Sequence, residues 1–563
     1  MNTGLSGAEN KRKMKWWQES IVYEIYVKSF KDSNGDGIGD INGIIEKLDY
    51  LRSLGIGAIW LTPVYKSPQA DNGYDIADYY KIDESYGSME DMERLISEAG
   101  KRNIKIVMDL VFNHTSDKNE WFLESKASHD NEKSSWYIWR DAKPDGSEPN
   151  NWRSIFGGSA WTWCEERGQY YLHTFLPEQP DLNWENPDMR QAVYDVANFW
   201  VKKGVGGFRM DAVTYIKKPE DFSDGREDAA DGMAGIHSMT ANTKGILDFL
   251  HEFKENVQKG TDIFCVGEAN GVSASELPEW VGNRGVFDMI FEFSHIDIDL
   301  DDETDWCRRR KWKLSELKSC ITASQTSTAR EGWYPIFFEN HDQGRSIDHF
   351  FADSKDPVSA GKALAAALMT LRGTPFIYQG EEIGIRNLKL DSIDSYEDIS
   401  TINHYKFARE SGHTEKEAMD AVHHFSRDNA RTPMQWTAGD HAGFSSADPW
   451  FRLSDDYKDI NVEAESSDEN SLLSWYRKLL GVRRSRVELI NGDYREIMHE
   501  NEQIYAYIRD NGEKSSLVLI NFSDRDAAYD PEIIGSYEFL ISSCGDKAAK
   551  GSLRPYEAVI YKD

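Results

Sequence analysis

The sequence predicts an α/β protein: a closed (β/α)8 TIM barrel with an inserted subdomain after the third strand and a C-terminal all-β sandwich domain. Strand-like apolar runs alternate with segments of helical periodicity, which is typical of parallel βαβ units. There are eight such runs, the number that closes a parallel sheet into a barrel. After about residue 490 the helical pattern stops and short alternating strands follow.

The expected barrel strands are Ile21–Phe30, Ala58–Val64, Ile104–Phe112, Val205–Val213, Ile263–Ala269, Phe287–Phe293, Pro335–Glu339 and Thr374–Tyr378. Segments between them carry apolar residues at helical spacing, namely Ile41–Ser53, Met89–Arg102, Met189–Lys203 and Thr243–Gln258. In such a barrel the chemistry lies at the carboxyl ends of the strands. Several of the runs end there in polar residues, among them Asn113-His114, Arg209-x-Asp211, Glu268 and Asn340-His341-Asp342.

Two long interruptions and a terminal change of pattern define the expected domains. The barrel spans 14–114 and 188–489, after an extension over 1–13. Residues 115–187 form an inserted subdomain, because a structureless loop of that length is improbable, and a second insertion covers about 383–465. Residues 490–563 form the β-sandwich, with strands at Ile504–Ile508, Ser516–Asn521, Tyr537–Ile541 and Ala558–Tyr561.

Composition limits the classes of partner. The formal net charge of −32 argues against nucleic acid and against an anionic membrane surface. Five cysteines, odd in number and without a CxxC pair, favour reduced thiols and a cytoplasmic location. Residues Met1 to Lys15 lack an apolar signal-peptide core, and no run reaches the roughly 18–20 apolar residues of a membrane span. We expect a monomer or a weak homo-oligomer.

The fourth strand ends in a charged pair. Arg209 and Asp211 point to the same side of the strand, because side chains alternate. Such an arginine can hold the carboxylate ionised and oriented. An ionised carboxylate at this place suits a nucleophile at a sugar carbon. Taken alone, an ordinary buried ion pair explains the motif equally well.

Five ordered motifs resemble those of one enzyme family. Asp109–His114, Gly207–Asp211, Val266–Glu268 and Asn340–Asp342 resemble the four motifs of glycoside hydrolase family 13, the α-amylase family. Gln179–Trp184 is similar to a further motif of its oligo-1,6-glucosidase branch. The run Arg427–Trp436 resembles the subfamily of oligo-1,6-glucosidases, dextran glucosidases, α-glucosidases and sucrose isomerases.

The resemblance implies roles for three carboxylates. Asp211 is expected to be the nucleophile that forms a glycosyl-enzyme, and Glu268 the general acid and base. The two should lie about 5–5.5 Å apart, the separation that retains configuration. Asp342 is expected to bind sugar hydroxyls and to stabilise the transition state, while Asp109 supports the site structurally.

The resemblance also implies a substrate pocket that is closed at one end. Its expected members are Asp71, Tyr74, His114, Arg209, His341 and Arg427. His114 and His341 would bind glucose hydroxyls, and Asp71 with Arg427 would grip the non-reducing end, so that the enzyme acts from chain ends. Each histidine alone is more often structural than functional.

A glycine-rich loop after the first strand is the candidate metal site. Oxygen ligands at alternate positions suit a hard cation such as Ca²⁺. By resemblance the ligands are Asp32, Asn34, Asp36, the carbonyl of Ile38 and Asp40. Gly43 stands where an EF-hand needs a glutamate, so an EF-hand is not expected, and a plain turn is the alternative. No organic cofactor is expected.

The expected function is that of a retaining exo-α-glucosidase on short oligosaccharides such as isomaltose, isomalto-oligosaccharides and maltose, with sucrose as a further substrate. In this subfamily Ala at the position of Ala212 tends toward α-1,4 bonds, whereas Val accompanies α-1,6 specificity. The runner-up is a transglucosidase or sucrose isomerase. Ser294–Asp299 lacks the isomerase loop pattern, which makes isomerisation less favoured.

A phosphorylated substrate and a non-catalytic role are both less favoured. The basic run Arg308–Lys311 could bind a phosphorylated sugar, as in trehalose-6-phosphate hydrolases, but we expect it to be a solvated helix face. Relatives that have lost catalysis serve as subunits of amino-acid transporters. Those carry a membrane helix and lack parts of the triad, whereas this chain retains Asp211, Glu268 and Asp342.

Overall fold

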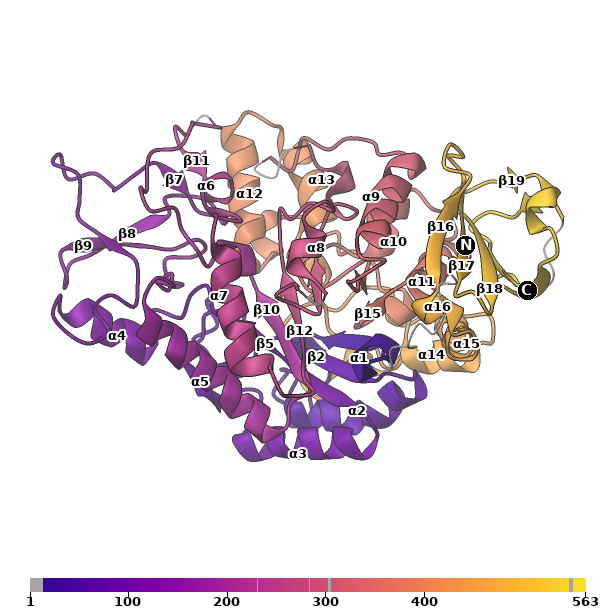
Figure 1. Cartoon of the computed structure of the whole chain (residues 1–563), viewed down its shortest axis with the longest axis horizontal. Coiled ribbons are helices and arrows are strands. Elements are labelled where there is room, and N and C mark those ends of the chain that lie inside the picture. Colours follow the sequence, from indigo (N-terminus) through magenta and orange to yellow (C-terminus); the bar gives the residue numbers. More distant parts are fainter. Residues whose placement is uncertain (1–13, 230, 283, 302–304, 546–549) are drawn as a thin grey trace, which may run out of the picture.

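The computed structural model describes residues 14–229, 231–282, 284–301, 305–545 and 550–563. The expected extension over 1–13 lies outside these residues. Figure 1 shows an elongated molecule with a barrel in its middle, small strands and loops at one end and an antiparallel sheet at the other.

Eight parallel strands form the central sheet. They are β1 (Val22–Ile25), β2 (Ala58–Leu61), β5 (Lys105–Val111), β10 (Gly207–Asp211), β12 (Phe264–Glu268), β13 (Met289–Phe291), β14 (Pro335–Ile336) and β15 (Thr374–Tyr378). Their order is β13-β12-β10-β5-β2-β1-β15-β14, and the two outer strands approach each other, so that the sheet curves into a barrel. Each expected apolar run contains one strand, which confirms the predicted fold class. The seventh strand is short because only Pro335 and Ile336 pair with β15.

Helices cover the outside of the barrel. They include α2 (Ile41–Ser53), α3 (Met89–Lys101), α5 (Pro187–Lys203), α7 (Ile246–Phe253), α9 (Leu314–Ser327), α11 (Pro357–Thr370) and α15 (Leu472–Ser485). Local sequence sets their ends. The hydroxyl of Ser88 caps α3, and Gly204, at φ 98°, ends α5 in a left-handed conformation that suits glycine. The expected helix Thr243–Gln258 is α7 followed by one π-helical turn.

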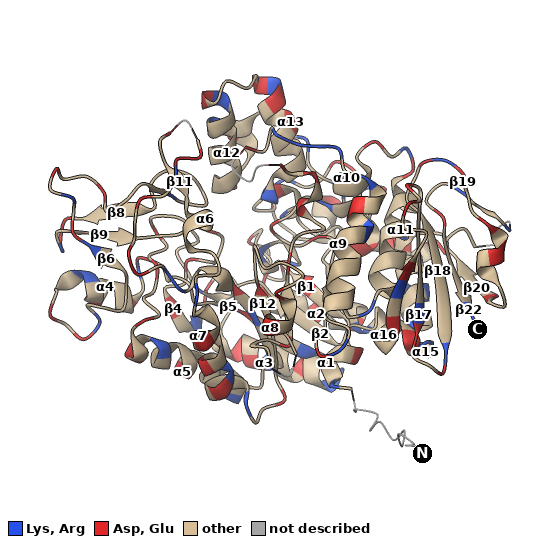
Figure 2. Ribbon diagram, turned by 45° about the horizontal axis from the view of Figure 1, so that its top comes forward, with Lys and Arg blue, Asp and Glu red and all other residues tan. Residues whose placement is uncertain are grey.

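Further helices and strands complete the barrel and its loops. The helices are α1 (Trp16–Glu19), α4 (Glu120–Ala127), α6 (Ile236–Thr240), α8 (Leu277–Trp280), α10 (Ser346–Phe351), α12 (Ile399–Glu410), α13 (Glu415–Phe425), α14 (Val462–Ser467) and α16 (Glu488–Asn491). Strands β3 (Tyr65–Lys66) and β4 (Asp78–Ile82) form a two-stranded sheet. Figure 2 shows charged residues on outer helices such as α5 and α13.

A module of small sheets follows β5. Strands β6 (Trp139–Arg140), β9 (Gln169–Leu172) and β8 (Trp161–Cys164) form an antiparallel sheet in that order. Strand β7 (Trp152–Arg153) pairs with β11 (Ala234–Gly235), which comes from the loop after β10. The module has its own apolar cluster, built around Trp152, Trp161 and Leu172. Because β11 pairs with β7, the loop after β10 is held by this module as well as by the barrel.

The C-terminal region is a five-stranded antiparallel sheet in the order β16-β17-β18-β22-β20, with a two-stranded sheet beside it. The strands are β16 (Asp493–Ile497), β17 (Ile504–Asp510), β18 (Ser515–Asn521), β19 (Ala527–Ala528), β20 (Glu538–Ser542), β21 (Ser552–Leu553) and β22 (Ala558–Lys562). On β18, Leu517 and Leu519 face the small sheet β19-β21, while Val518 and Ile520 belong to the core shared with the barrel. Side chains thus alternate between two apolar layers.

The C-terminal sheet is bonded to the barrel as well as packed on it. Arg509 on β17 is buried and donates hydrogen bonds to the carbonyls of Leu489 and Gly492 at 2.9 and 2.8 Å and also to that of Thr370 at the end of α11. The hydroxyls of Tyr507 and Thr370 lie 2.5 Å apart. Within the described residues, no helix has the length and apolar character needed to cross a bilayer.

Candidate active site

The three predicted carboxylates meet at the carboxyl ends of the barrel strands. Asp211 is the last residue of β10, Glu268 is the last residue of β12, and Asp342 follows β14. All three line one cavity of about 260 Å³. The same cavity is lined by four of the predicted substrate-binding residues and by Ala212; the four are Asp71, Tyr74, His114 and Arg427.

Arg209 lies behind the cavity and connects its carboxylates. The side chain is almost fully buried, and its Nη1 lies 2.7 Å from Oδ1 of Asp211 and 2.9 Å from Oδ1 of Asp109. Its Nη2 lies 2.9 Å from Oε2 of Glu268. Asp109 is on β5 and Glu268 on β12, the two neighbours of β10, so one guanidinium joins three adjacent strands. A buried cation with three carboxylates around it fixes their positions.

The charge balance around Asp211 sets its protonation. Burial raises the pKa of Asp211 well above its ordinary value; Arg209 opposes this, and the negative charges of Glu268 and Asp109 add to it. The neighbouring negative charges therefore oppose the ionised form of Asp211, and the contact with Arg209 favours it.

Glu268 is oriented by a backbone group as well as by Arg209. The amide N–H of Ala212 donates to Oε2 of Glu268 at 2.9 Å. Ala212 has φ 48° and ψ 37°, a left-handed conformation that is uncommon for a residue with a side chain. This turn directly after Asp211 aims the Ala212 amide at Glu268 and places the Ala212 methyl group in the cavity wall.

His341 is held as a cation behind Asp342. Its Nδ1 lies 2.6 Å from Oε1 of Glu24, and its Nε2 lies 3.2 Å from Oδ2 of Asp342. Burial lowers the pKa of His341, but the charges of Asp342 and Glu24 outweigh this and raise it to about 10. The ring of Tyr74 stacks on His341 with centroids 5.4 Å apart. Both nitrogens of His341 are thus occupied by protein groups, and His341 is not among the residues that line the cavity.

Two arginines close the other side of the cavity. Arg427 Nη1 lies 3.3 Å from Oδ1 of Asp342, and its Nη2 lies 3.3 Å from Oδ1 of Asp71. Arg431 Nη2 lies 2.8 Å from Oδ1 of Asp342. Burial works against ionisation of Asp342, but His341, Arg427 and Arg431 hold its pKa well below the usual range. Asp342 is therefore an ionised carboxylate at neutral pH.

Sequence reasoning missed several of these partners. Arg431 lies four residues after Arg427 in a run that the sequence analysis singled out, so the signal for it was present. Asp398, which pairs with Arg427 at 2.5 Å, lies in the second insertion, where no pattern marked it. Glu24 looks like an ordinary residue of the first strand, and its role is visible only from its contact with His341.

His114 is bonded to the loop that follows the small-sheet module. Its Nε2 lies 3.1 Å from the carbonyl oxygen of Tyr74 and 3.0 Å from Nε2 of Gln179. Burial lowers the pKa of His114 to about 4, so the ring is neutral near pH 7. Gln179 also donates to Oδ2 of Asp71 at 3.1 Å. Gln179 opens the motif Gln179–Trp184, which therefore contacts the cavity wall directly.

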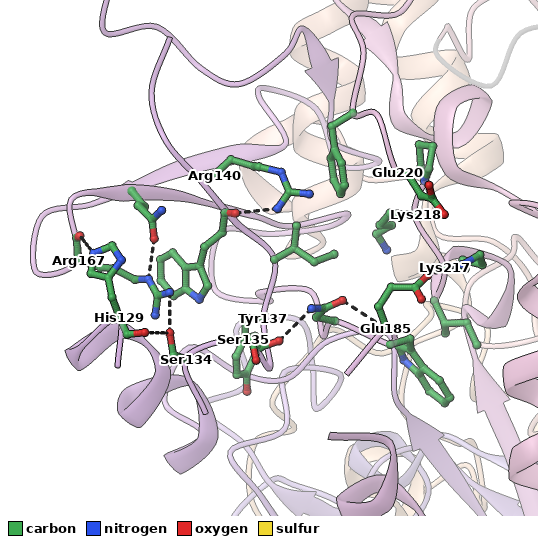
Figure 3. A pocket seen from close by; sticks show the side chains of 18 residues that line it. His129, Ser134, Ser135, Tyr137, Arg140, Arg167, Glu185, Lys217, Lys218 and Glu220 are labelled. Atoms are coloured by element: carbon green, nitrogen blue, oxygen red, sulfur yellow. Dashed lines mark hydrogen bonds and ion pairs between the residues drawn. The ribbon is translucent and has the colours of Figure 1, made fainter. Parts of the chain in front are cut away.

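A larger cavity of about 450 Å³ lies between the small-sheet module and the loop after β10 (Figure 3). It contains none of the three carboxylates. Lys218, labelled in Figure 3, is buried and bonds Oδ2 of Asp181 at 2.8 Å and Oδ1 of Asn113 at 3.0 Å. This cavity is larger, but the smaller one holds the convergent charged groups, and we assign the chemistry to the smaller one.

The glycine-rich loop is folded by its own side chains. Oδ1 of Asp32 accepts hydrogen bonds from the amides of Asn34 and Gly35 at 2.9 and 2.7 Å, and Asp40 accepts one from Gly43 at 2.7 Å. Oδ2 of Asp32 accepts from the hydroxyl of Ser445 at 2.6 Å. Across the described residues, two clusters, both outside this loop, bring ligand atoms of three histidine, cysteine or carboxylate side chains within 4.8 Å of one another: Asp299/His349/His424 and Asp305/Cys307/His413.

The basic run Arg308–Lys311 is not a helix face, so that expectation is wrong. The run is an extended loop that precedes α9, where a bridge between Arg309 and Leu300 replaces helical hydrogen bonds. Arg309 pairs with Asp299 at 3.1 Å, and Arg310 pairs with Glu316 at 3.0 Å. No residue of this run is among those that line the carboxylate cavity.

The barrel with buried carboxylates at adjacent strand ends defines the chain as a glycoside hydrolase. Residues 24–492 match the family described as "Alpha amylase, catalytic domain", and the chain belongs to this family. It is 44% identical over 97% of its length to an oligo-1,6-glucosidase of Parageobacillus thermoglucosidasius, of which it covers 99%.

Solved structures with the same architecture include enzymes of differing activity. A trehalose-6-phosphate hydrolase of Bacillus licheniformis superimposes with a TM-score of 0.90 at 40% identity, over 98% of this chain and 100% of that one. An isomaltulose synthase of Erwinia rhapontici superimposes with a TM-score of 0.93 at 39% identity, over 98% and 99%. Because the fold is shared by hydrolases and an isomer-forming enzyme, the substrate must be argued from the site.

Proposed function

We propose that the chain is a retaining exo-α-glucosidase of short α-glucosides. The observation that carries this is the shared contact of Asp211 and Glu268 with Arg209 inside a cavity that Asp71 and Arg427 close. A nucleophile and an acid held on one cation match the requirement of double displacement. The small volume of the cavity, about 260 Å³, fits one glucose unit better than a continuous chain.

In the first step the Asp211 carboxylate attacks the anomeric carbon. The bond from that carbon to the leaving oxygen breaks, and Glu268 gives its proton to that oxygen. In the second step Glu268 takes a proton from water, the water oxygen attacks the same carbon, and the bond to Asp211 breaks. Glucose leaves with the configuration of the substrate, and both carboxyl groups return to their starting state.

The rest of the cavity wall accounts for cleavage at the end of a sugar chain. Asp342 is kept ionised by His341, Arg427 and Arg431, so it can accept hydrogen bonds from sugar hydroxyls and stabilise developing positive charge. The pair Asp71–Arg427 lines the same cavity beside Asp342 and would hold the hydroxyls of a terminal glucose. A sugar chain that continued past this pair would meet protein.

The bond that is cleaved depends on the wall beside the leaving sugar. Similarity to a protein named oligo-1,6-glucosidase argues for cleavage of α-1,6 bonds. Ala212 argues for α-1,4 bonds, by resemblance to the subfamily. Tyr215, His237, Asn270 and Gln343 line the same cavity and are candidates for this wall. A sucrose isomerase or transglucosidase would use the same glucosyl-enzyme, with a sugar in place of water in the second step.

The deciding experiment is release of glucose from isomaltose, maltose and sucrose, measured side by side with Asp211→Asn as the control. Glucose from isomaltose or maltose, absent in the variant, supports the proposal. An isomeric disaccharide from sucrose would favour a sucrose isomerase. Equal absence of product for both proteins on all three sugars would overturn the proposed substrates.

We also propose that the loop Asp32–Asp40 holds one structural Ca²⁺. The proposed ligands are Asp32, Asn34, Asp36, the carbonyl of Ile38 and Asp40. The proposal rests on the resemblance and on a repeated local pattern. The side-chain oxygens of Asp32, Asn34 and Asp36 each accept the amide two residues ahead, at 2.9, 2.9 and 2.8 Å, so hard oxygens recur at alternate positions of an ordered loop. Bound Ca²⁺ would neutralise this acidic loop and stabilise the first barrel loop.

Removal of Ca²⁺ with a chelator should lower the melting temperature, and Ca²⁺ should restore it. The Asp36→Ala variant should show no such response, while Asp145→Ala, a change at an exposed residue elsewhere, should respond like the wild type. If Ca²⁺ does not change the melting temperature of the wild type, the proposed site is wrong.

A cytoplasmic location and a monomeric or weakly associating state complete the proposal. All five cysteines are free thiols in the structure, as a reducing compartment would keep them. Light scattering at increasing protein concentration measures the oligomeric state directly; a stable large assembly would contradict this part.

A further inference from the structure

Three loops that supply the catalytic cavity also meet in a buried cluster outside it. Asp299 ends a 3-10 turn (Asp297–Asp299), His349 lies on α10, and His424 lies on α13. Along the chain, these elements adjoin Asp297, Asp342 and Arg427, which line the cavity. The cluster therefore joins segments that are far apart in sequence and close in space.

The cluster brings one donor atom of each side chain to a common point. His424 Nε2 lies 2.9 Å from Oδ2 of Asp299, and His349 Nε2 lies 3.8 Å from Oδ1 of Asp299. The ligand atoms of all three residues lie within 4.8 Å of one another. The two imidazole rings stack with centroids 5.1 Å apart, so both present nitrogen toward the carboxylate.

Two of these atoms are left without a hydrogen bond. Oδ1 of Asp299 and Nε2 of His349 are both buried and unpartnered. Their separation of 3.8 Å is too long for a hydrogen bond between them. Leaving buried polar atoms unsatisfied costs free energy, and a cation between them would remove that cost.

We propose that Asp299, His349 and His424 form a Zn²⁺ site that ties the three loops together. Two imidazole nitrogens and one carboxylate oxygen are ligands that Zn²⁺ prefers, whereas Ca²⁺ and Mg²⁺ prefer oxygen alone. Ligand atoms around tetrahedral Zn²⁺ stand about 3.3 Å apart, as follows from bond lengths of about 2.0 Å. The observed separations are 2.9 Å from His424 Nε2 to Oδ2 of Asp299 and 3.8 Å from His349 Nε2 to Oδ1. Both lie near that value, and because they end on different carboxylate oxygens, either oxygen of Asp299 could be the ligand. Water would take the fourth position.

The histidines are in the form that binds metal. Burial lowers the pKa of His349 to about 4, and it lowers the pKa of His424 as well, so both rings are neutral near pH 7. Neutral imidazole has the free lone pair that coordination requires. Burial works against ionisation of Asp299, but the hydrogen bond with His424 and the guanidinium of Arg309 lower its pKa.

The charge of Arg309 opposes metal binding at the Asp299 carboxylate. Its Nη2 lies 3.1 Å from Oδ2 of Asp299, and it supplies a positive charge there in the metal-free protein. The Arg309 side chain is 38% exposed, so it can turn toward solvent when Zn²⁺ binds. We therefore expect that replacing Arg309 by an uncharged residue strengthens Zn²⁺ binding.

The test uses the full-length protein, stripped with a chelator and titrated with Zn²⁺ in a buffer that contains excess Ca²⁺. The wild type should bind one equivalent, and its melting temperature should rise. His349→Gln and His424→Gln should each weaken Zn²⁺ binding by at least about 100-fold. Mutation of a residue that only hydrogen-bonds to a metal ligand already lowers metal affinity by about 10–100-fold. Arg309→Gln should bind Zn²⁺ more tightly than the wild type.

His413→Gln is the matched control, because it removes a histidine from the neighbouring cluster Asp305/Cys307/His413. Its Zn²⁺ affinity should equal that of the wild type. Loss of binding in His413→Gln alone, or a wild type that binds no Zn²⁺, would overturn the proposal. If either ligand variant fails to fold, Arg309→Gln decides, and an unchanged or weaker affinity in that variant counts against the site.

Discussion

The guanidinium of Arg209 lies 2.7 Å from the carboxylate of Asp211, two residues further along the same strand. The same guanidinium reaches Glu268 on the neighbouring strand at 2.9 Å. Because β10 and β12 are hydrogen-bonded in parallel, the strands fix the backbone positions and Arg209 fixes the side chains. The separation of the two carboxyl groups is therefore set by a cation that no substrate needs to touch.

Arg209→Lys should leave the carboxyl groups of Asp211 and Glu268 poorly positioned. A single ammonium group cannot contact Asp109, Asp211 and Glu268 at once, as the forked guanidinium does. We expect kcat on the best disaccharide to fall by about 10²–10³-fold, the cost of losing one well-placed donor. The melting temperature should fall too. Arg94→Lys, at an exposed arginine that pairs with Asp91, is the control, and a wild-type kcat in Arg209→Lys would contradict the argument.

Chemical rescue can assign the two carboxylates. In Asp211→Gly, azide should enter the vacated space and give the β-glucosyl azide from an aryl α-glucoside. In Glu268→Ala the glucosyl-enzyme should still form from this good leaving group, and azide should then give the α-product. The two products differ in anomeric configuration, which NMR reads directly. Exchanged outcomes would mean that the two roles are reversed.

The pH dependence of stability should report the charge on His341. Its pKa is about 10 in the folded protein, against about 6.5 in an unfolded chain. Because the folded value is the higher one, the stabilisation is complete below about pH 6.5 and disappears as the pH rises through about 10. The difference in unfolding free energy between wild type and His341→Gln should shrink over that range. A constant difference for His341→Gln over that range would contradict the assignment.

Ala212→Val should shift linkage preference toward isomaltose. The added methyl groups enter the cavity wall, and a small hydrophobic change in a pocket is worth about 10-fold or more in discrimination. Stability should fall, since a β-branched residue is strained at φ 48°. Ala212→Gly removes the strain without adding bulk and should not favour isomaltose. Equal ratios of kcat/KM for maltose and isomaltose in all three proteins would eliminate Ala212 as the selector.

The barrel was predictable because its signals are local. Alternating apolar runs and helical segments mark each βα unit, and Asp211 and Glu268 stand directly at the ends of their runs. The caps of the helices follow the same logic, as Ser88 and Gly204 show. No long-range information is needed for these features.

The partners that tune the site were not predictable in this way. Asp398 lies in a long insertion where no motif marked it, whereas Arg431 lies in the run Arg427–Trp436 that the sequence does mark. The contacts of Asp398 with Arg427 and of Arg431 with Asp342 exist only after the insertion folds over the barrel. The basic run Arg308–Lys311 carries many charges but no helical hydrogen bonds, because Asp299 and Glu316 hold its arginines in an extended loop. Charge pattern alone does not distinguish these two conformations.

The order of strands in the C-terminal sheet bears on how the chain folds during synthesis. Strand β22 lies between β18 and β20, so the sheet cannot be completed before residues 558–562 have left the ribosome. Until then, the surface of α11 that β18 and β22 cover together is not fully shielded from water. A newly made barrel therefore keeps an apolar face incompletely covered until residues 558–562 are made, even though every residue of its catalytic cavity has already been made.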